Sequence, residues 1–402
     1  MTIDSRPRGS GPTGIISADD HVIEPPDLWQ NRLPAKHRAE GPHVVLAPRD
    51  AARFDPAARS WVLSESGDGP VAAFWHYEDR VKPLTRNEAA AGFDPDTVDT
   101  TPVSFDEIRP GCWQQGARLA DMDLNGIEAS MCFPNYPRFS GQLFSEGKDR
   151  DLGLACIRDY NDWMVEDWCA GSQGRLIPLC IIPLWDVHLA TEEIRRNAVR
   201  GVRAVSFSEI PAWLGAPSVH SGYWDPFFAA CEETRTVVCM HIGSGSRILT
   251  TSEDAPSAVA GVMIFSNSAA SMLDFLTSGI LVRFPQLRLF YAESQIGWIP
   301  YILERADDMF LRQKWTFPKG TDVLPSEMYR GRVYSCFYSD RVGIAQLDIV
   351  GAEQVMFETD FPHESGTWPN SKAVAIEQLS GVEPAVRERI LRGNAVDLFG
   401  LV

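Results

Sequence analysis

The stretch Phe357-Glu358-Thr359-Asp360-Phe361-Pro362-His363 decides the fold, because it places an acid directly after an apolar run, with a histidine three residues later. A matching stretch lies near the other end of the chain, where the strand-like residues 15–18 lead into Asp19-Asp20-His21. In a barrel of parallel strands the first and last strands are neighbours, and their carboxyl ends open onto one site. The two stretches together predict a metal-dependent enzyme.

Between these stretches, short β-rich runs alternate with amphipathic segments of helical period. Strict alternation predicts a parallel sheet, and eight units predict its closure into a barrel. We therefore predict one (β/α)8 TIM-barrel domain over residues 1–402. The predicted strands are residues 15–18, 127–133, 176–182, 202–207, 236–241, 288–293, 333–336 and 354–360. The predicted helices are residues 149–170, 187–200, 224–234, 257–278, 299–312, 343–350, 371–379 and 383–399.

Residues 25–109 break this rhythm, since they are rich in proline, glycine and charge. Alternating runs at 43–46 and 71–75 predict a β-hairpin or a small sheet within this insertion. The insertion follows the carboxyl end of the first strand, so we expect it to overhang the mouth of the active site. It is either a lid over that mouth or a decoration at the edge of the barrel.

Net charge, the lack of targeting segments and the cysteine pattern indicate which partners and which cellular compartment to expect. The chain has 37 basic and 54 acidic residues, a net charge of −17, which argues against nucleic acid or an anionic membrane. No signal peptide and no apolar run of membrane-spanning length is evident, so we expect a soluble, cytoplasmic protein. The eight scattered cysteines form no C-x-x-C pair and predict buried, reduced thiols.

Five metal-ligating side chains fall at the ends of predicted strands: Asp19, His21, His241, Glu293 and Asp360. Alternate residues of a strand point the same way, so Asp19 and His21 should grip one ion together while the intervening acid points elsewhere. A lone histidine at a strand end is usually structural, and a lone acid often caps the next helix. Their coincidence on several strands of one barrel instead predicts a metal site.

These residues resemble the amidohydrolase superfamily, in the branch that contains aminocarboxymuconate-semialdehyde decarboxylase and many metal-dependent hydrolases. The resemblance spans residues 15–400 and implies a small-molecule substrate; homodimers are common among the proteins that the chain resembles. The matching stretches are residues 16–29, 118–123, 240–243, 293–300, 359–363 and 367–370.

The resemblance also implies roles for individual residues. The family's first-strand His-x-His pair corresponds to Asp19 and His21, with an acid at the first position. Its fifth-strand ligand corresponds to His241, and its last-strand aspartate, which binds metal and handles the proton of the attacking water, to Asp360. The sixth-strand histidine is replaced by Glu293, which departs from the decarboxylases of the family.

The number and identity of the metal ions stay open. Three carboxylates with two histidines would offset the charge of two divalent ions, and carboxylates can bridge such a pair. Oxygen and nitrogen ligands without thiolate suit iron, zinc or manganese equally. We therefore expect one or two divalent ions per chain.

Further candidates lie near the same strand ends. His363 is either an extra ligand or a general acid, and Glu209 is either a substrate contact or a helix cap after the fourth strand. Trp298 and Trp368 either wall an apolar pocket or pack in the core, and His220 is a candidate substrate contact from a loop.

Three functions compete on these observations. The acid-rich site favours a metal-dependent hydrolase that cleaves an ester, thioester or amide, with Asp360 taking the proton of a metal-activated water. The alternative is non-oxidative decarboxylation of an aromatic or unsaturated acid, which the loss of the sixth-strand histidine disfavours. A metal-free barrel acting as a scaffold is a third class, which metal content would test.

Overall fold

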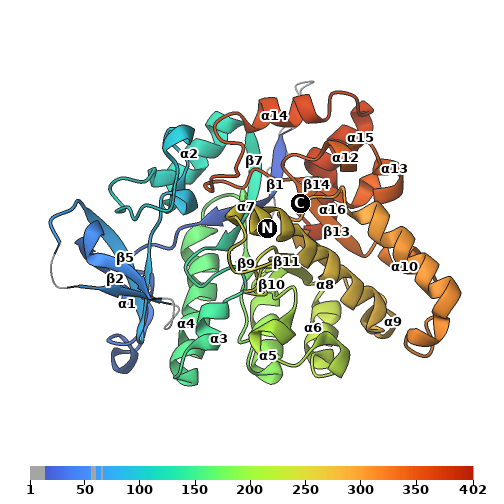
Figure 1. Ribbon diagram of the computed structural model, residues 1–402, viewed down its shortest axis with the longest axis horizontal. Coiled ribbons are helices and arrows are strands. Elements are labelled where there is room, and N and C mark those ends of the chain that lie inside the picture. Colours follow the sequence, from blue (N-terminus) through green and yellow to red (C-terminus); the bar gives the residue numbers. More distant parts are fainter. Residues whose placement is uncertain (1–13, 56–59, 65–66, 402) are drawn as a thin grey trace.

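The computed structural model describes residues 14–55, 60–64 and 67–401, and its centre is a parallel β-barrel (Figure 1). Neighbouring strands are parallel and hydrogen-bonded in chain order, with β8 and β9 separated at Pro178, which has no backbone N–H to donate. The TIM barrel predicted from the alternation is confirmed. Its strands are β1 (Ile15–Val22), β7 (Ile127–Pro134), β8 (Leu176–Ile177), β9 (Leu179–Cys180), β10 (Ala204–Phe207), β11 (Val237–His241), β12 (Leu289–Ala292), β13 (Val333–Phe337) and β14 (Val355–Phe357).

The first and last strands lie side by side, as the sequence predicted. The backbone N–H of Asp360 donates to the carbonyl of Asp19 at 3.1 Å, and that of His21 donates to the carbonyl of Phe361 at 2.7 Å. Strand β1 is longer than predicted, because it stays paired with β7 as far as Val22. Strand β14 is shorter than predicted, since Glu358 and the residues after it leave the strand.

Helices surround the barrel (Figure 1). The predicted helix at 343–350 is two short helices, and the predicted helix at 383–399 is interrupted by a π-helical turn at Arg389–Gly393. Helix α2 was not predicted; it ends at Gly126, whose left-handed φ of 74° suits glycine. The helices are α1 (Leu28–Arg32), α2 (Gln115–Asn125), α3 (Gln142–Glu146), α4 (Arg150–Trp163), α5 (Val187–Ala198), α6 (Asp225–Thr234), α7 (Ser257–Met263), α8 (Phe265–Thr277), α9 (Ile280–Arg283), α10 (Ile299–Gln313), α11 (Pro325–Tyr329), α12 (Arg341–Ile344), α13 (Leu347–Val350), α14 (Ser371–Gln378), α15 (Pro384–Glu388) and α16 (Asn394–Phe399).

The core has two layers, one inside the barrel and one between the barrel and its helices. Small and large side chains such as Ala18, Met131 and Phe290 fill the interior, so the barrel is packed and is not a pore. All eight cysteines are buried and free, which confirms the predicted reduced thiols. Burial of each large apolar side chain contributes about 1.5–3 kcal/mol, so this double core stabilises the barrel.

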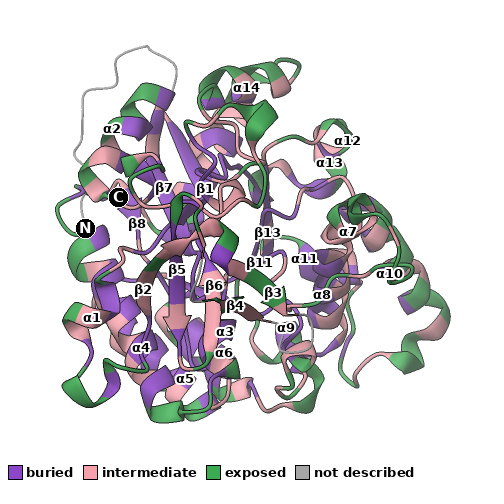
Figure 2. Cartoon of the chain, turned by 60° about the vertical axis from the view of Figure 1, so that its left-hand side comes forward, coloured by how far each residue is buried: buried purple, intermediate pink, exposed green. Residues whose placement is uncertain are grey.

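The insertion after β1 forms the small sheet that was predicted. Strands β2 (His43–Pro48), β5 (Val71–Tyr77) and β6 (Arg80–Pro83) are antiparallel, and β3 (Ala52–Asp55) pairs with β4 (Ser60–Leu63) (Figure 2). The insertion rests on the loop after β14, because Ala91 N–H donates to the carbonyl of Pro362 and Glu364 N–H donates to that of Asn87, both at 3.1 Å. It therefore contacts the loop that carries His363, while its action as a lid stays a prediction.

One apolar helical stretch, Ser257–Thr277, is long and apolar enough to cross a membrane by length and composition alone. It comprises α7 and α8, and a third of its window is buried. Helix α8 buries Met272, Phe275 and Leu276 in the core layer between the barrel and its helices.

Candidate metal centre

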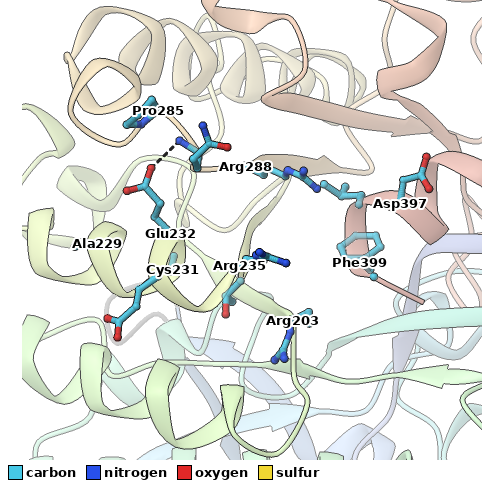
Figure 3. A pocket seen from close by; sticks show the side chains of 14 residues that line it. Arg203, Ala229, Cys231, Glu232, Arg235, Pro285, Arg288, Asp397 and Phe399 are labelled. Carbon is cyan, nitrogen blue, oxygen red and sulfur yellow. Dashed lines mark hydrogen bonds between the residues drawn. The ribbon is translucent and has the colours of Figure 1, made fainter. Parts of the chain in front are cut away.

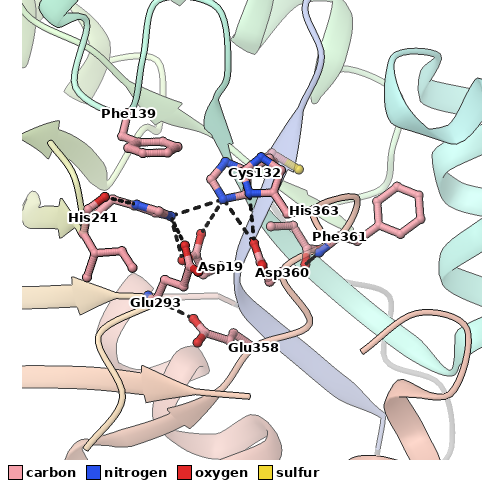
Figure 4. Close-up of polar contacts among 12 residues, drawn as sticks. Asp19, Cys132, Phe139, His241, Glu293, Glu358, Asp360, Phe361 and His363 are labelled. Carbon is pink, nitrogen blue, oxygen red and sulfur yellow. Dashed lines mark hydrogen bonds and ion pairs between the residues drawn. The ribbon is translucent and has the colours of Figure 1, made fainter. Parts of the chain in front are cut away.

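The five predicted ligands converge at the carboxyl end of the barrel (Figure 4). His21 Nε2 lies 3.2 Å from His241 Nε2 and 3.3 Å from Asp360 Oδ1. His241 Nε2 lies 3.3 Å from both Asp19 Oδ2 and Glu293 Oε2. The structure thus brings together side chains from β1, β11, and the segments directly after β12 and β14.

Local backbone geometry aims these side chains at one point. Asp19 and His21 alternate along β1 and face the cluster, whereas Asp20 accepts hydrogen bonds from Ser17 Oγ at 3.0 Å and Phe361 N–H at 3.1 Å. Glu293 and Asp360 have left-handed φ angles of 50° and 52°, which non-glycine residues adopt at a cost of about 1–3 kcal/mol. Such strain is typical of functional sites, where the surrounding fold holds a side chain in a required direction.

The cluster fits a divalent cation. Both carboxylate oxygens of Asp19 and Oδ1 of Asp360 are buried without a hydrogen-bond partner within the described residues. His241 Nδ1 lies 2.7 Å from the carbonyl of Ile242, which accepts its N–H and leaves Nε2 free to bind an ion. Buried unpaired carboxylates are costly, and a cation bound among them removes that cost.

The electrostatics of the cluster also favour a cation. Burial raises the pKa of Asp19 and Glu293 well above the usual range, and repulsion from Asp360 adds to both shifts. Burial alone would raise the pKa of Asp360 too, but the neighbouring His363 and His21 lower it overall. Burial lowers the pKa of His21 well below its usual value, so this imidazole is neutral and available as a ligand.

The predicted catalytic residue His363 lies beside the ligands. Its ring stacks on that of His21 with centroids 3.7 Å apart, and its Nδ1 is 3.3 Å from Asp360 Oδ1. Its Nε2 lies 3.3 Å from Asn135 Nδ2. Because 13% of its side chain is exposed while Asp360 is fully buried, His363 connects the carboxylate to solvent.

The four predicted substrate contacts have different surroundings. Glu209 is buried, accepts a hydrogen bond from Ser268 Oγ at 2.8 Å, and has its pKa raised to about 8 by burial. Trp298 donates to the carbonyl of Ser294 and packs against the core layer between the barrel and its helices.

Trp368 and His220 complete this set. Trp368 packs edge to face on Phe361, beside the candidate site, with Arg109 over its ring. His220 is instead nearly half exposed and pairs with Asp274 of α8 at 3.0 Å, on the surface and not among the side chains of the cluster.

Several neighbours of the cluster were missed from the sequence, among them Glu358, Asn135 and Phe139. Glu358 is buried beneath it and accepts a hydrogen bond from Glu293 N–H at 3.1 Å. Its position two residues before Asp360 was a usable signal, because alternate residues of an extended chain share a face. Asn135 and Phe139 lie in the loop after β7, and Phe139 stacks on His241 at 4.0 Å; no local pattern marks either residue.

Residues 50–401 match the family model described as amidohydrolase. The chain belongs to the amidohydrolase family. A gamma-resorcylate decarboxylase of Rhodococcus jostii is 27% identical over 345 residues, which cover 79% of this chain and 95% of that protein.

Solved structures share the fold of this chain. An amidohydrolase from Mycobacterium avium subsp. paratuberculosis matches with a TM-score of 0.72 and 21% identity, covering 97% of this chain and all of that one. A 5-carboxyvanillate decarboxylase from Novosphingobium aromaticivorans, complexed with manganese and 4-hydroxy-3-methoxy-5-nitrobenzoic acid, matches with a TM-score of 0.66 and 16% identity, covering the whole of both chains.

These comparisons contradict the predicted hydrolase. The curated relatives and several of the matched structures are named decarboxylases, so the preference for an ester or thioester hydrolase was wrong. The physical reason is that the same strand-end ligands serve both reactions. The replacement of the sixth-strand histidine by Glu293 was given too much weight.

Proposed function

We propose that this amidohydrolase family member is a metal-dependent, non-oxidative decarboxylase of an aromatic carboxylic acid. The observation that carries the proposal is the match to gamma-resorcylate decarboxylases across more than two thirds of the chain. The convergent ligand cluster at the carboxyl end of the barrel, where barrel enzymes have their active sites, supports it.

The residues that would hold the ion are Asp19, His21, His241 and Asp360, with Glu293 beside them. Their oxygen and nitrogen atoms are compatible with manganese, which a solved decarboxylase of the same fold binds. When bound, a divalent ion supplies positive charge that orients and polarises the oxygen atoms of a substrate.

Asp360 and His363 are suited to move the proton that the reaction requires. Decarboxylation adds one proton to the ring carbon that bears the carboxylate, after which the carbon–carbon bond breaks and CO2 leaves. Asp360 faces the cluster, and His363 Nδ1 lies 3.3 Å from its Oδ1 with part of its ring exposed. Because its pKa is lowered, Asp360 is ionised at rest; we assign His363 to take up the proton from solvent and Asp360 to pass that proton on to the ring carbon.

Aromatic and polar neighbours would position the substrate. Phe139 is half-buried and stacks on His241, so its ring offers an apolar surface to an aromatic substrate. Ser365 Oγ donates to Asp360 Oδ2 at 2.7 Å and lies 3.4 Å from Glu293 Oε1, which fixes these two carboxylates relative to each other. Burial of the carboxylates keeps water away from the reacting carbon.

The proposal is tested with manganese-loaded protein and hydroxybenzoates, beginning with 2,6-dihydroxybenzoate and 5-carboxyvanillate. We expect release of CO2 and, in D2O, one deuterium at the carbon that lost its carboxylate, measured by NMR. Asp360→Asn should lower kcat by about 10²–10⁴-fold, because the proton-transfer group is lost together with a proposed metal ligand. Asp308→Asn is the matched control, since Asp308 lies on α10 and pairs there with Arg312 at 2.7 Å.

Two results would contradict these assignments. Protein that binds manganese but releases no CO2 from any hydroxybenzoate would overturn the proposal. Equal activity of Asp360→Asn and Asp308→Asn would overturn the assigned proton transfer while leaving the substrate class in place.

A further inference from the structure

A cleft lies at the end of the barrel opposite the candidate metal centre, and it is formed by residues that precede strands. Its volume is about 800 Å³, and Arg203, Arg235 and Arg288 line it (Figure 3). These residues come just before β10, β11 and β12, whereas the candidate metal ligands lie on or directly after strands. The cleft is therefore separate from the candidate metal centre.

The backbone places the arginines on adjacent strands. Val237 N–H donates to the carbonyl of Arg203 at 2.8 Å, and Val238 N–H donates to the carbonyl of Arg288 at 3.0 Å. Neighbouring strands are about 4.8 Å apart, so three cationic residues begin close to one another. Like charges on adjacent strands repel unless other groups compensate them.

Other arginines at this end have an evident structural role. Arg203 donates to the carbonyls of Ala198 and Val202, at the end of α5, and Arg332 donates to those of Met328 and Leu281. Side chains of this type satisfy the free carbonyls at helix ends. The fold thus shows how an arginine serves as a helix cap here.

The side chains of Arg235 and Arg288 do not have that role, although the backbone N–H of Arg235 caps the end of α6. Across residues 14–55, 60–64 and 67–401, no hydrogen bond or ion pair engages either guanidinium group. Both residues are exposed in the cleft, where their charges are free to meet a ligand.

The acids that line the cleft already have partners. Glu233 pairs with Arg195 at 3.0 Å, and Asp397 pairs with Arg389 at 2.7 Å. Glu232 accepts a hydrogen bond from the backbone N–H of Gln286 at 2.6 Å. Of the three arginines that line the cleft, Arg235 and Arg288 are therefore the two whose guanidinium groups have no polar partner within the described residues.

We propose that this cleft is a binding site for a phosphate-bearing small molecule, held by Arg235 and Arg288. A guanidinium group presents paired N–H donors that match the oxygen atoms of phosphate, and such charge-assisted bonds are the strong ones. The site is independent of the decarboxylase activity, because none of its residues reaches the metal cluster.

The test measures binding of radiolabelled inorganic phosphate to the metal-loaded protein by equilibrium dialysis, at constant ionic strength set with chloride. We expect saturable binding of about one phosphate per chain. Arg235→Gln with Arg288→Gln should weaken it at least about tenfold, because two charge-assisted contacts are lost. Arg305→Gln with Arg312→Gln is the control, because both residues are exposed on α10 and their substitution removes the same amount of positive charge.

Two results would overturn the proposal. One is the absence of saturable phosphate binding to the unmodified protein. The other is equal phosphate affinity in the cleft variant and the α10 variant, which would place the phosphate elsewhere. Because the arginines are exposed, both double variants should fold, and equal melting temperatures would confirm it.

Discussion

Glu209 shows at the scale of one residue how burial changes proton affinity in this barrel. Burial raises its pKa to about 8 from 4.5, with Ser268 opposing the shift. A carboxyl whose folded pKa is raised contributes its stability below the unfolded pKa and loses it as pH rises through the folded pKa. The free energy of unfolding should therefore fall between about pH 4.5 and 8, by at most about 1.4 kcal/mol per pH unit from this group.

Glu209→Gln tests this directly. The amide oxygen can still accept the hydrogen bond from Ser268, but the side chain no longer titrates. Urea unfolding at several pH values should show a shallower loss of stability in the variant than in the unmodified protein. Glu304→Gln, at an exposed position on α10, should keep the original slope; identical slopes in all three proteins would contradict the buried, neutral Glu209.

At the scale of elements, the insertion and the barrel share a small core. Leu84, after β6, is buried with Ile23 and Phe361, which belong to the segments after β1 and β14. Leu84→Ala should lower the free energy of unfolding by about 2–5 kcal/mol through lost burial and a residual cavity. Leu46→Ala is the control in the same sheet, because Leu46 is 64% exposed and its loss should cost less than about 0.5 kcal/mol.

The form of the transition is the decisive measurement. Denaturation followed by fluorescence and by circular dichroism should give one shared transition that moves to lower urea in Leu84→Ala. An early partial transition with an unchanged barrel transition would show that the insertion unfolds independently and does not stabilise the loop that carries His363.

At the scale of the whole molecule, the metal ion should stabilise the fold. Asp19, Glu293 and Asp360 are buried close together, and their negative charges repel one another. Manganese at about one hundred times its dissociation constant should raise the free energy of unfolding by about 2.7 kcal/mol over chelator-treated protein.

Asp19→Asn provides the comparison for this effect. The variant loses a ligand and a buried charge, so its unfolding should respond much less to manganese. Equal stability of the unmodified protein with and without manganese, measured by urea unfolding, would contradict a metal bound by the folded cluster.

The order of strands and most of the ligand cluster could be predicted because both depend on local patterns. Apolar runs of strand length define the barrel, and a polar residue at the end of such a run must face its carboxyl end; Asp19, His21, His241 and Asp360 follow this rule. Helix α2 was missed despite its glycine stop, and β1 was cut short because Asp19 and His21 are polar although buried.

The sequence by itself determined the fold, the family and the candidate ligands, whereas the tertiary structure decided which further side chains lie beside those candidates. Asn135 contacts His363, which lies 228 residues away in the sequence. Ser17 Oγ accepts a hydrogen bond from the backbone N–H of Thr359, 342 residues away. His220, plausible as a substrate contact from its loop, instead pairs with α8. Contacts between distant segments depend on how packed elements are placed relative to one another, and periodicity within a single segment contains no record of that placement.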